Sequence, residues 1–415
     1  MPDVFVAPGV RTPFVKGGGS FAAYDSLSLS TPVAQAMAAR ARPDFVVWGE
    51  VIPEPTLTNI ARELVLAAGL EAEIPAFSTV LACSTSFMGV IESAGMVGRG
   101  GTHLALVGGV ETMSHVPIAL KTEVADRLVA TFPRDPGAAA AMLTHLTAAD
   151  FNLPLKAWAN RVSGKSQGEH TEDTARRFGI TREEQDRWAL TSHQRAVAGQ
   201  DEGFFDDLVI PFGGVEHDTL PRRDTSLERL AALRTVYDAN GTITAGNASP
   251  VTDGAASIWV GDAEGLARLG AAAAIRLADW EIAAIDFRLD EGILMAPGRA
   301  IPRLLARHGL KFDDIALFEI HEAFAAQVLA NIKAAGDPAY RRERAHVDAD
   351  MGAFPWERAN PHGGSLAIGH PFAATGARIL SQAANELVAL PAGSRAIVSV
   401  CADGGQGTVA LLERA

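Results

Sequence analysis

The sequence predicts an α/β fold, because short apolar runs alternate with longer helical stretches along its 415 residues. An apolar fraction of 48% beside 20% charged residues describes a globular chain with a sizeable core. The formal net charge is −13, which argues against a general phosphate-binding surface and so against nucleic acid as the main partner.

Five runs have the composition of strands, at residues 4–8, 76–82, 102–109, 314–320 and 394–400. Directly after Cys83, apolar residues recur at helical spacing from Phe87 to Val97, which predicts a buried helix. The segment 116–243 is more charged and is broken by prolines, and Thr181 with Glu184 forms the capping-box pattern of a helix start. We expect this segment to be a large insertion.

A weak internal repeat links the two ends of the chain. A predicted helix precedes the strand-like run at residues 102–111, and another predicted helix precedes the similar run at residues 394–405. We therefore expect two related halves that face each other.

The chain has two cysteines, Cys83 and Cys401, so a disulfide framework is excluded and a reducing compartment is favoured. The first residues show neither a basic leader with an apolar stretch nor an Arg-rich amphipathic segment. The longest uncharged stretch near the middle is too short to cross a membrane. We expect a cytoplasmic protein with no transmembrane segment.

Cys83 follows an apolar run and precedes the predicted helix, whose dipole and unpaired amides would lower the pKa of its thiol. It is a candidate nucleophile, and a buried, inert cysteine is the alternative. His370 lies in the run 360–371, where Pro371 suits the first turn of the next helix. Because a helix N-terminus disfavours imidazolium, His370 is a candidate general base, with a simple capping role as the alternative.

Two more residues that can carry chemistry follow predicted strands. Cys401 precedes a glycine-rich turn that begins at Asp403, and a second thiol at a strand end suits proton transfer. His321 follows the run 314–320 and can donate a hydrogen bond to a developing oxyanion.

These motifs, in this order, resemble the thiolase family of acyl-CoA acyltransferases, essentially from end to end. The matching stretches are residues 11–14, the Cys83 segment, 246–249, 253–256, 321–324, 363–371 and the hairpin around Cys401. The resemblance implies a thiolase fold, in which duplicated βαβαβαββ halves form a layered α-β-α-β-α core with an inserted loop domain. On that pattern, the N-terminal half spans 1–115 and is completed by 244–265, the CoA-binding loop domain spans 116–243, and the C-terminal half spans 266–415. It also implies a homodimer or homotetramer.

The resemblance also implies the roles of the candidate residues. Cys83 would accept the acyl group, His370 would activate it, and Cys401 would be the acid/base. His321, helped by a water, would stabilise the thioester enolate, while the backbone amides of Cys83 and Asp403 would hold the tetrahedral intermediate. CoA and acyl-CoA are then substrates, and the chemistry needs neither a metal nor a permanently bound cofactor.

For CoA, the resemblance implies contacts to Arg222, Ala245 and Ser249, with Phe324 and Gln167 lining the pocket. Two positions depart from the family pattern. Gln167 precedes Gly168 where methionine is common, and Asp403 stands where glycine or alanine is usual. A carboxylate beside an oxyanion hole is unfavourable unless it points away or is paired.

The sequence His321-Glu-Ala-Phe resembles the degradative branch, typified by the β-subunit of the fatty-acid-oxidation trifunctional enzyme. We therefore expect cleavage of 3-oxoacyl-CoA of medium or longer chains in β-oxidation, and a hydratase/dehydrogenase α-subunit as a partner. The helical stretch around Met142 to Trp158 is a candidate contact with a partner or a membrane surface; the alternatives are a lid over the acyl pocket and plain packing.

Four alternatives stay open. A biosynthetic acetyl-CoA C-acetyltransferase that makes acetoacetyl-CoA would differ in chain-length preference. A β-ketosynthase uses one cysteine with two histidines, so the second cysteine argues against it. A non-catalytic acyl-CoA-binding protein on the same scaffold would not need Cys83, His370 and Cys401. Two cysteines and two histidines could also bind structural zinc, although their spacing matches no zinc ribbon or finger. A papain-like hydrolase lacks its local cysteine signature here.

Overall fold

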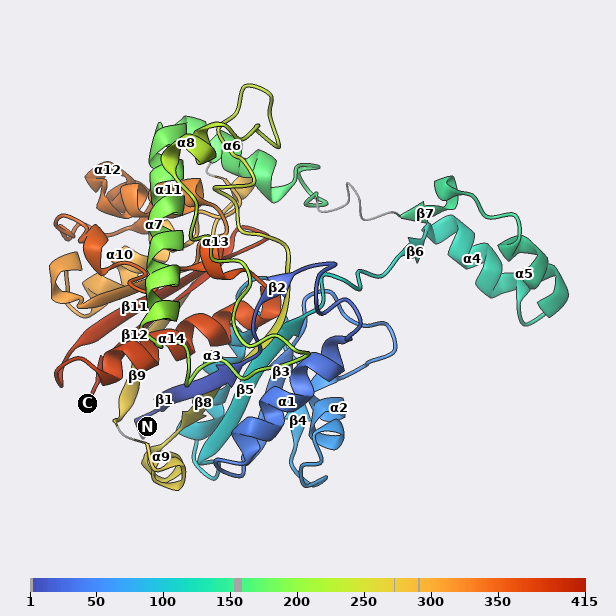
Figure 1. Ribbon diagram of the computed structural model, residues 1–415, viewed down its shortest axis with the longest axis horizontal. Coiled ribbons are helices and arrows are strands. Elements are labelled where there is room, and N and C mark those ends of the chain that lie inside the picture. Colours follow the sequence, from blue (N-terminus) through green and yellow to red (C-terminus); the bar gives the residue numbers. More distant parts are fainter. Residues whose placement is uncertain (1–2, 153–158, 272, 290–291) are drawn as a thin grey trace.

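The computed structural model describes residues 3–152, 159–271, 273–289 and 292–415. Its strands are β1 (Phe5–Arg11), β2 (Val15–Lys16), β3 (Phe45–Gly49), β4 (Ala76–Phe77), β5 (Leu104–Glu111), β6 (Ala119–Leu120), β7 (Phe151–Asn152), β8 (Thr252–Gly261), β9 (Ile275–Ala284), β10 (Leu317–Ile320), β11 (Arg395–Ala402) and β12 (Gln406–Arg414). The alternation of strands and helices confirms the predicted α/β class (Figure 1).

The helices of the first half and of the long connection before β8 are α1 (Ser26–Ala38), α2 (Ile60–Ala67), α3 (Thr85–Gly98), α4 (Thr122–Thr131), α5 (Pro136–Leu143), α6 (Gln167–Phe178), α7 (Arg182–Asp201) and α8 (Leu227–Ala231). Those that follow β8 are α9 (Ala263–Leu269), α10 (Pro297–Arg307), α11 (Ala325–Gly336), α12 (Pro338–Tyr340), α13 (Ser365–Ile368) and α14 (Thr375–Val388). The expected start of α7 is confirmed, because Thr181 and Glu184 cap it reciprocally.

The sheet shows the same topology twice. Its strand order is β10-β11-β12-β9-β1-β8-β5-β3-β4. In one half β3 and β5 are parallel, β5 and β8 antiparallel, and β8 and β1 antiparallel. In the other half β10 and β11, β11 and β12, and β12 and β9 repeat those three relations in the same order. The two halves join where β1 pairs antiparallel with β9, so the repeat seen in the sequence is a structural duplication.

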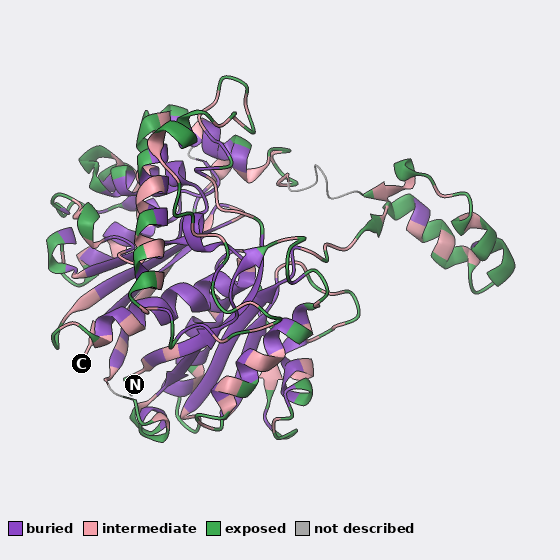
Figure 2. Ribbon diagram, in the orientation of Figure 1, coloured by how far each residue is buried: buried purple, intermediate pink, exposed green. Residues whose placement is uncertain are grey.

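Helices form three layers around the two halves of the sheet. One core packs α1 and α2 against the outer face of β1, β3, β5 and β8. A second packs α10 and α11 against the outer face of β9 to β12. The third contains side chains of α3 and α14 together with residues of both halves, such as Val107 of β5 and Val398 of β11. The expected α-β-α-β-α layering is confirmed, with α3 and α14 buried at its centre (Figure 2).

The central helices α3 and α14 approach each other closely. The Ser86 hydroxyl donates to the Ala373 carbonyl and accepts the Ala377 N–H at 2.8 Å. A Cβ on Gly376 would lie 2.3 Å from the Phe87 backbone nitrogen, so only glycine fits there. This contact holds the N-terminal ends of α3 and α14 side by side.

The structure corrects two expectations about local structure. The run 76–82 is a strand only at Ala76–Phe77, and the remainder is an irregular segment that leads to Cys83. The stretch expected to be helical around Met142 to Trp158 contains the end of α5, a 3-10 turn (Ala148–Asp150) and β7, and its residues 153–158 lie outside the described residues.

Together α4, α5, β6 and β7 form an arm that stands away from the layered body (Figure 1). Within the described residues, every helix is too short or too polar to span a bilayer.

Candidate active site

Cys83 lies in a tight turn just before α3. Ala82 has a φ of +45°, a left-handed conformation that is unusual for alanine. The turn is held by the Thr85 hydroxyl, which donates to the Ala82 carbonyl at 2.7 Å and accepts the Leu81 N–H at 2.9 Å. Ser84 is the N-cap residue of α3. This strained turn presents the buried Cys83 side chain at the centre of the molecule.

His370 faces Cys83 from the equivalent end of the other half. Its Nε2 lies 3.2 Å from the Cys83 sulfur, and its Nδ1 lies 2.6 Å from the Thr375 hydroxyl. The Thr375 hydroxyl donates to the Pro371 carbonyl, so it accepts from Nδ1–H, and this network assigns a lone pair to Nε2. The His370 backbone N–H donates to the Thr252 hydroxyl at 3.0 Å. His370 is therefore oriented to accept the thiol proton.

Burial makes both members of this pair neutral in the resting protein. It lowers the pKa of His370 to about 3, with a further contribution from Arg378. Burial and the Asp403 carboxylate raise the pKa of Cys83 to about 12. The sequence led us to expect a lowered thiol pKa, and that expectation is wrong because desolvation outweighs the favourable amides at this depth. The thiolate therefore forms only as the thiol proton moves to His370.

Cys401 lies on β11, and one hydrogen bond from β11 and one from its neighbour β12 join these strands to the Cys83 turn. The Ser84 hydroxyl donates to the Val400 carbonyl at 3.3 Å, and Thr408 of β12 donates to the Ser84 hydroxyl at 3.1 Å. Burial and the nearby Cys83 raise the pKa of Cys401 well above its usual value. Cys401 is thus a neutral thiol that can give up a proton inside the site.

His321 completes the cluster at the end of β10. Its ring centroid is 4.2 Å from that of His370, and one ligand atom from each of Cys83, His321 and His370 lies within 4.8 Å of the others. These are three of the four ligands that a structural zinc takes, and Cys401 is not in the group. His321 Nδ1 lies 2.9 Å from the Ser365 hydroxyl, while Nε2 is buried with no partner among the described residues.

Asp403 stands in the turn between β11 and β12, which Gly404 and Gly405 make possible with φ values of +83° and +76°. The backbone N–H groups of Asp403 and Cys83 both act on the Cys83 sulfur and favour its charged form. Two amides at this point are placed to bind an oxyanion formed on the carbon that Cys83 attacks. The Asp403 carboxylate acts in the opposite sense, and its Oδ1 is buried with no partner in the described part of the chain.

Comparison with known proteins agrees with this geometry. Residues 4–264 match the thiolase N-terminal domain, and residues 272–414 match the thiolase C-terminal domain. The chain belongs to the thiolase family.

Named relatives of this thiolase cover its whole length. A 3-ketoacyl-CoA thiolase of Erwinia tasmaniensis is 36% identical over 99% of this chain and 96% of its own. One from Yersinia enterocolitica is 33% identical over the same shares. Among solved structures, the acetyl-CoA acetyltransferase of Bacillus anthracis matches with a TM-score of 0.82 and 28% identity, over 100% of this chain and 99% of that one.

An apolar wall contains Cys401, one of the two cysteines of this thiolase. Its buried members, which include the expected pocket residue Phe324, are Ile243, Ile293, Leu294, Ala323, Phe324 and Cys401. Gln167, the other expected pocket residue, is the half-buried first residue of α6. The Tyr237 ring covers the next residue, Gly168, so closely that a Cβ there would lie 2.2 Å from the ring.

The expected CoA contacts lie on the connection between α7 and β8. Ser249 is half-buried and donates its backbone N–H to the Ala323 carbonyl at 2.9 Å, which joins it to the His321 segment. Ala245 and the Arg222 side chain are exposed. The Arg222 backbone N–H donates to His193 Nδ1 at 3.2 Å, which fixes this part of the connection on α7. Their contacts with CoA stay a prediction.

The structure adds four residues that the sequence did not single out. Thr252 and Thr375 hold His370, and Ser365 and Arg378 lie behind His321. Ser365 was visible within the run 363–371, but nothing in that run indicates which side chain it bonds. Thr252 lies far from His370 in the chain, so only the fold reveals their contact.

Proposed function

We propose that this thiolase catalyses CoA-dependent cleavage of 3-oxoacyl-CoA to acetyl-CoA and a shortened acyl-CoA, reversible by Claisen condensation. The observation that carries the proposal is the neutral Cys83–His370 pair at 3.2 Å beside the second buried thiol of Cys401. The names of the Erwinia and Yersinia relatives support the 3-oxoacyl substrate.

The reaction then runs in two halves. The Cys83 thiol proton moves to His370 Nε2, and the sulfur attacks the 3-oxo carbon. The bond between C2 and C3 breaks, the acyl group stays on Cys83, and the acetyl-CoA enolate takes a proton from Cys401. CoA next transfers its thiol proton to Cys401 and its sulfur attacks the acyl group. Cys83 leaves as a thiolate and recovers its proton from His370.

Each stage develops negative charge that this chain can stabilise. The amides of Cys83 and Asp403 would bind the tetrahedral oxyanion. His321 would donate to the enolate oxygen through its free Nε2. Arg222, Ala245 and Ser249 on the connection before β8 would hold CoA, and Gln167 and Phe324 would border its pantetheine and the acyl chain.

The biological setting follows from the same proposal. The apolar wall around Phe324 suits an acyl chain, which supports degradation of medium or longer fatty acyl chains rather than synthesis of acetoacetyl-CoA. A homodimer or homotetramer, a hydratase/dehydrogenase α-subunit partner and a cytoplasmic location stay predictions. The solved structure from Bacillus anthracis carries the alternative name, acetyl-CoA acetyltransferase.

The proposal is tested by CoA-dependent cleavage of 3-oxoacyl-CoAs of increasing chain length, followed by loss of the 3-oxo thioester. We expect turnover that rises with chain length, and none with Cys83→Ala. Cys401→Ala should still form an acyl group on Cys83 from an acyl-CoA, detected by mass spectrometry, but should lose carbon–carbon cleavage. Activity confined to acetoacetyl-CoA would favour the biosynthetic alternative, and turnover by Cys83→Ala would overturn the mechanism.

A further inference from the structure

The two histidines of the site need opposite protonation to do different work. His370 takes a proton from Cys83, so its Nε2 must be bare, whereas a hydrogen bond from His321 to an oxyanion requires a proton on Nε2. Burial, His370 and Arg378 lower the pKa of His321 well below its usual value, so His321 carries a single ring proton. Which nitrogen holds that proton is decided by the partner of Nδ1.

That partner is the Ser365 hydroxyl, 2.9 Å from His321 Nδ1. Its other partner among the described residues is Arg378, whose Nη2 donates to it at 2.9 Å. Guanidinium nitrogens donate and never accept, so Ser365 must use a lone pair toward Arg378. The only acceptor left for the Ser365 proton in the described part of the chain is His321 Nδ1.

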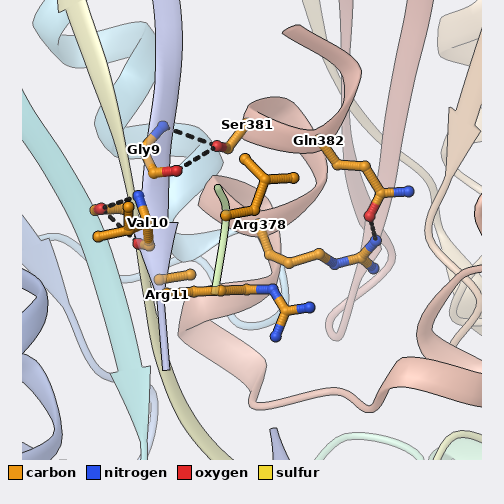
Figure 3. A pocket seen from close by; sticks show the side chains of 9 residues that line it. Gly9, Val10, Arg11, Arg378, Ser381 and Gln382 are labelled. Carbon is orange, nitrogen blue, oxygen red and sulfur yellow. Dashed lines mark hydrogen bonds between the residues drawn. The ribbon is translucent and has the colours of Figure 1, made fainter. Parts of the chain in front are cut away.

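Arg378 is itself held in place. It lies on α14, it is buried, and its Nη1 contacts Gln382 at 3.4 Å and Glu319 at 3.9 Å. Figure 3 shows its side chain running from α14 with the guanidinium turned toward Gln382 and next to Arg11. Arg378 thus occupies one lone pair of the Ser365 hydroxyl, and the Ser365 proton finds an acceptor in the described part of the chain only if His321 Nδ1 accepts it.

We propose that Ser365, held by Arg378, is a positioning residue that sets the tautomer of His321 with its proton on Nε2. His321 Nε2 then points its proton into the site, where it is buried with no partner in the described structure. Thr375 sets the opposite tautomer of His370. The Thr375 hydroxyl thereby makes His370 Nε2 a proton acceptor, and the Ser365 hydroxyl makes His321 Nε2 a proton donor. This inference rests on the proposed function for the step that it serves.

A double-mutant cycle tests the proposal. Ser365→Ala should lower the turnover number of the cleavage reaction about tenfold or more, because the donor to the enolate is no longer oriented. The KM and the rate of Cys83 acylation by acetyl-CoA should change less than about threefold, because acylation uses the backbone amides instead. Ser365→Thr, which keeps the hydroxyl, should restore cleavage.

The second arm uses His321→Asn. An amide side chain carries its donor hydrogens whatever Ser365 does, so adding Ser365→Ala to this variant should cause little further loss. Ser381→Ala is the matched control, since Ser381 of α14 is buried like Ser365 of α13 but bonds to Gly9 instead (Figure 3). An equal loss from Ser365→Ala in both backgrounds, or an equal loss of acylation, would show that Ser365 only supports the fold and would overturn the proposal.

The tautomer can also be read without any turnover. In protein labelled with ¹⁵N-histidine, His321 is identified by the signals that vanish in His321→Asn. We expect a protonated, pyrrole-type Nε2 at neutral pH in the wild-type protein. A pyridine-type Nε2 would overturn the inference. Failure of the wild-type protein to cleave any 3-oxoacyl-CoA would instead count against the proposed function and leave this readout intact.

Discussion

At the scale of single residues, Asp403 is the strongest departure from what the chemistry would favour. Its backbone N–H helps the Cys83 thiolate, while its carboxylate opposes it. The same carboxylate acts on His170, which is buried on α6 and bonds to the Ser163 hydroxyl at 2.7 Å. The Asp403 carboxylate therefore adds to the effect of burial in keeping the resting thiol protonated, at a cost in nucleophilicity that a neutral residue would not impose.

We predict that Asp403→Asn makes Cys83 more reactive. Removing the negative charge lowers the pKa of the thiol, so the thiolate fraction at pH 8 rises by about threefold to tenfold. The rate of alkylation by iodoacetamide measures this directly, in a Cys401→Ala background that leaves Cys83 as the only thiol. Asp201→Asn, which removes an exposed carboxylate paired with Arg223, should leave the rate unchanged. An unchanged rate in Asp403→Asn would contradict this account.

At the scale of elements, the reaction depends on how closely α3 and α14 pack. Cys83 precedes α3 and His370 precedes the turn that leads to α14, so the two side chains meet only if the ends of these helices meet. Ser86 and Gly376 make that contact, and neither belongs to the cluster of Cys83, His321 and His370. The 3.2 Å contact between Cys83 and His370 is thus a product of helix packing.

We predict that Gly376→Ala lowers both stability and activity. Its Cβ would lie 2.3 Å from the Phe87 nitrogen, which forces the two helices apart and costs about 1 to 3 kcal/mol in the free energy of unfolding. Thiolysis should fall more steeply than substrate binding, because the Cys83–His370 distance increases. Gly95→Ala in α3 is the control, since its Cβ meets nothing within 4 Å and a helical alanine is favourable. Urea unfolding and steady-state kinetics measure both effects.

At the scale of the whole molecule, the duplicated sheet creates the site. The equivalent strands β5 and β11 each follow a central helix, and the equivalent ends of those helices carry Cys83 and His370. The long connection before β8 then wraps this centre through α6 and α7. His193 of α7 holds that connection by accepting the Arg222 N–H, and burial followed by the charge of Arg222 lowers its pKa to about 4.

His193 should make stability depend on pH. Its folded pKa of about 4 lies below the ordinary histidine value of 6.5, so below pH 6.5 the unfolded chain binds a proton that the folded chain does not. The contribution of neutral His193 to the free energy of unfolding is therefore present above pH 6.5 and is lost as the pH falls toward 4. Between pH 6.5 and 5 the loss is about 2 kcal/mol.

The variant His193→Gln keeps an acceptor for Arg222 but cannot titrate. We expect the difference in free energy of unfolding between wild type and this variant to narrow by about 2 kcal/mol from pH 6.5 to pH 5. Urea unfolding followed by tryptophan fluorescence at both pH values measures it. A difference that stays constant with pH would show that His193 titrates normally in the folded protein.

Much of the fold was predictable because it depends on local patterns. The alternation of strand and helix, the capped start of α7 and the repeat around β5 and β11 all leave a signal within a few neighbouring residues. The prediction of a strand over 76–82 is wrong because it also relied on a local pattern. An apolar run does not reveal that the chain makes an irregular turn before Cys83.

The linear order of residues was enough to establish the family, the succession of motifs and the residue types that can carry the chemistry. The protonation of those residues depends on the fold. The position of Cys83 at a helix start predicted a lowered thiol pKa, but burial raises that pKa. No local sequence pattern shows how deeply a residue is buried. Likewise Ser365, Arg378, Thr252 and Thr375 act through partners that only folding brings near, because hydrogen bonds depend on distance in space and not on distance along the chain.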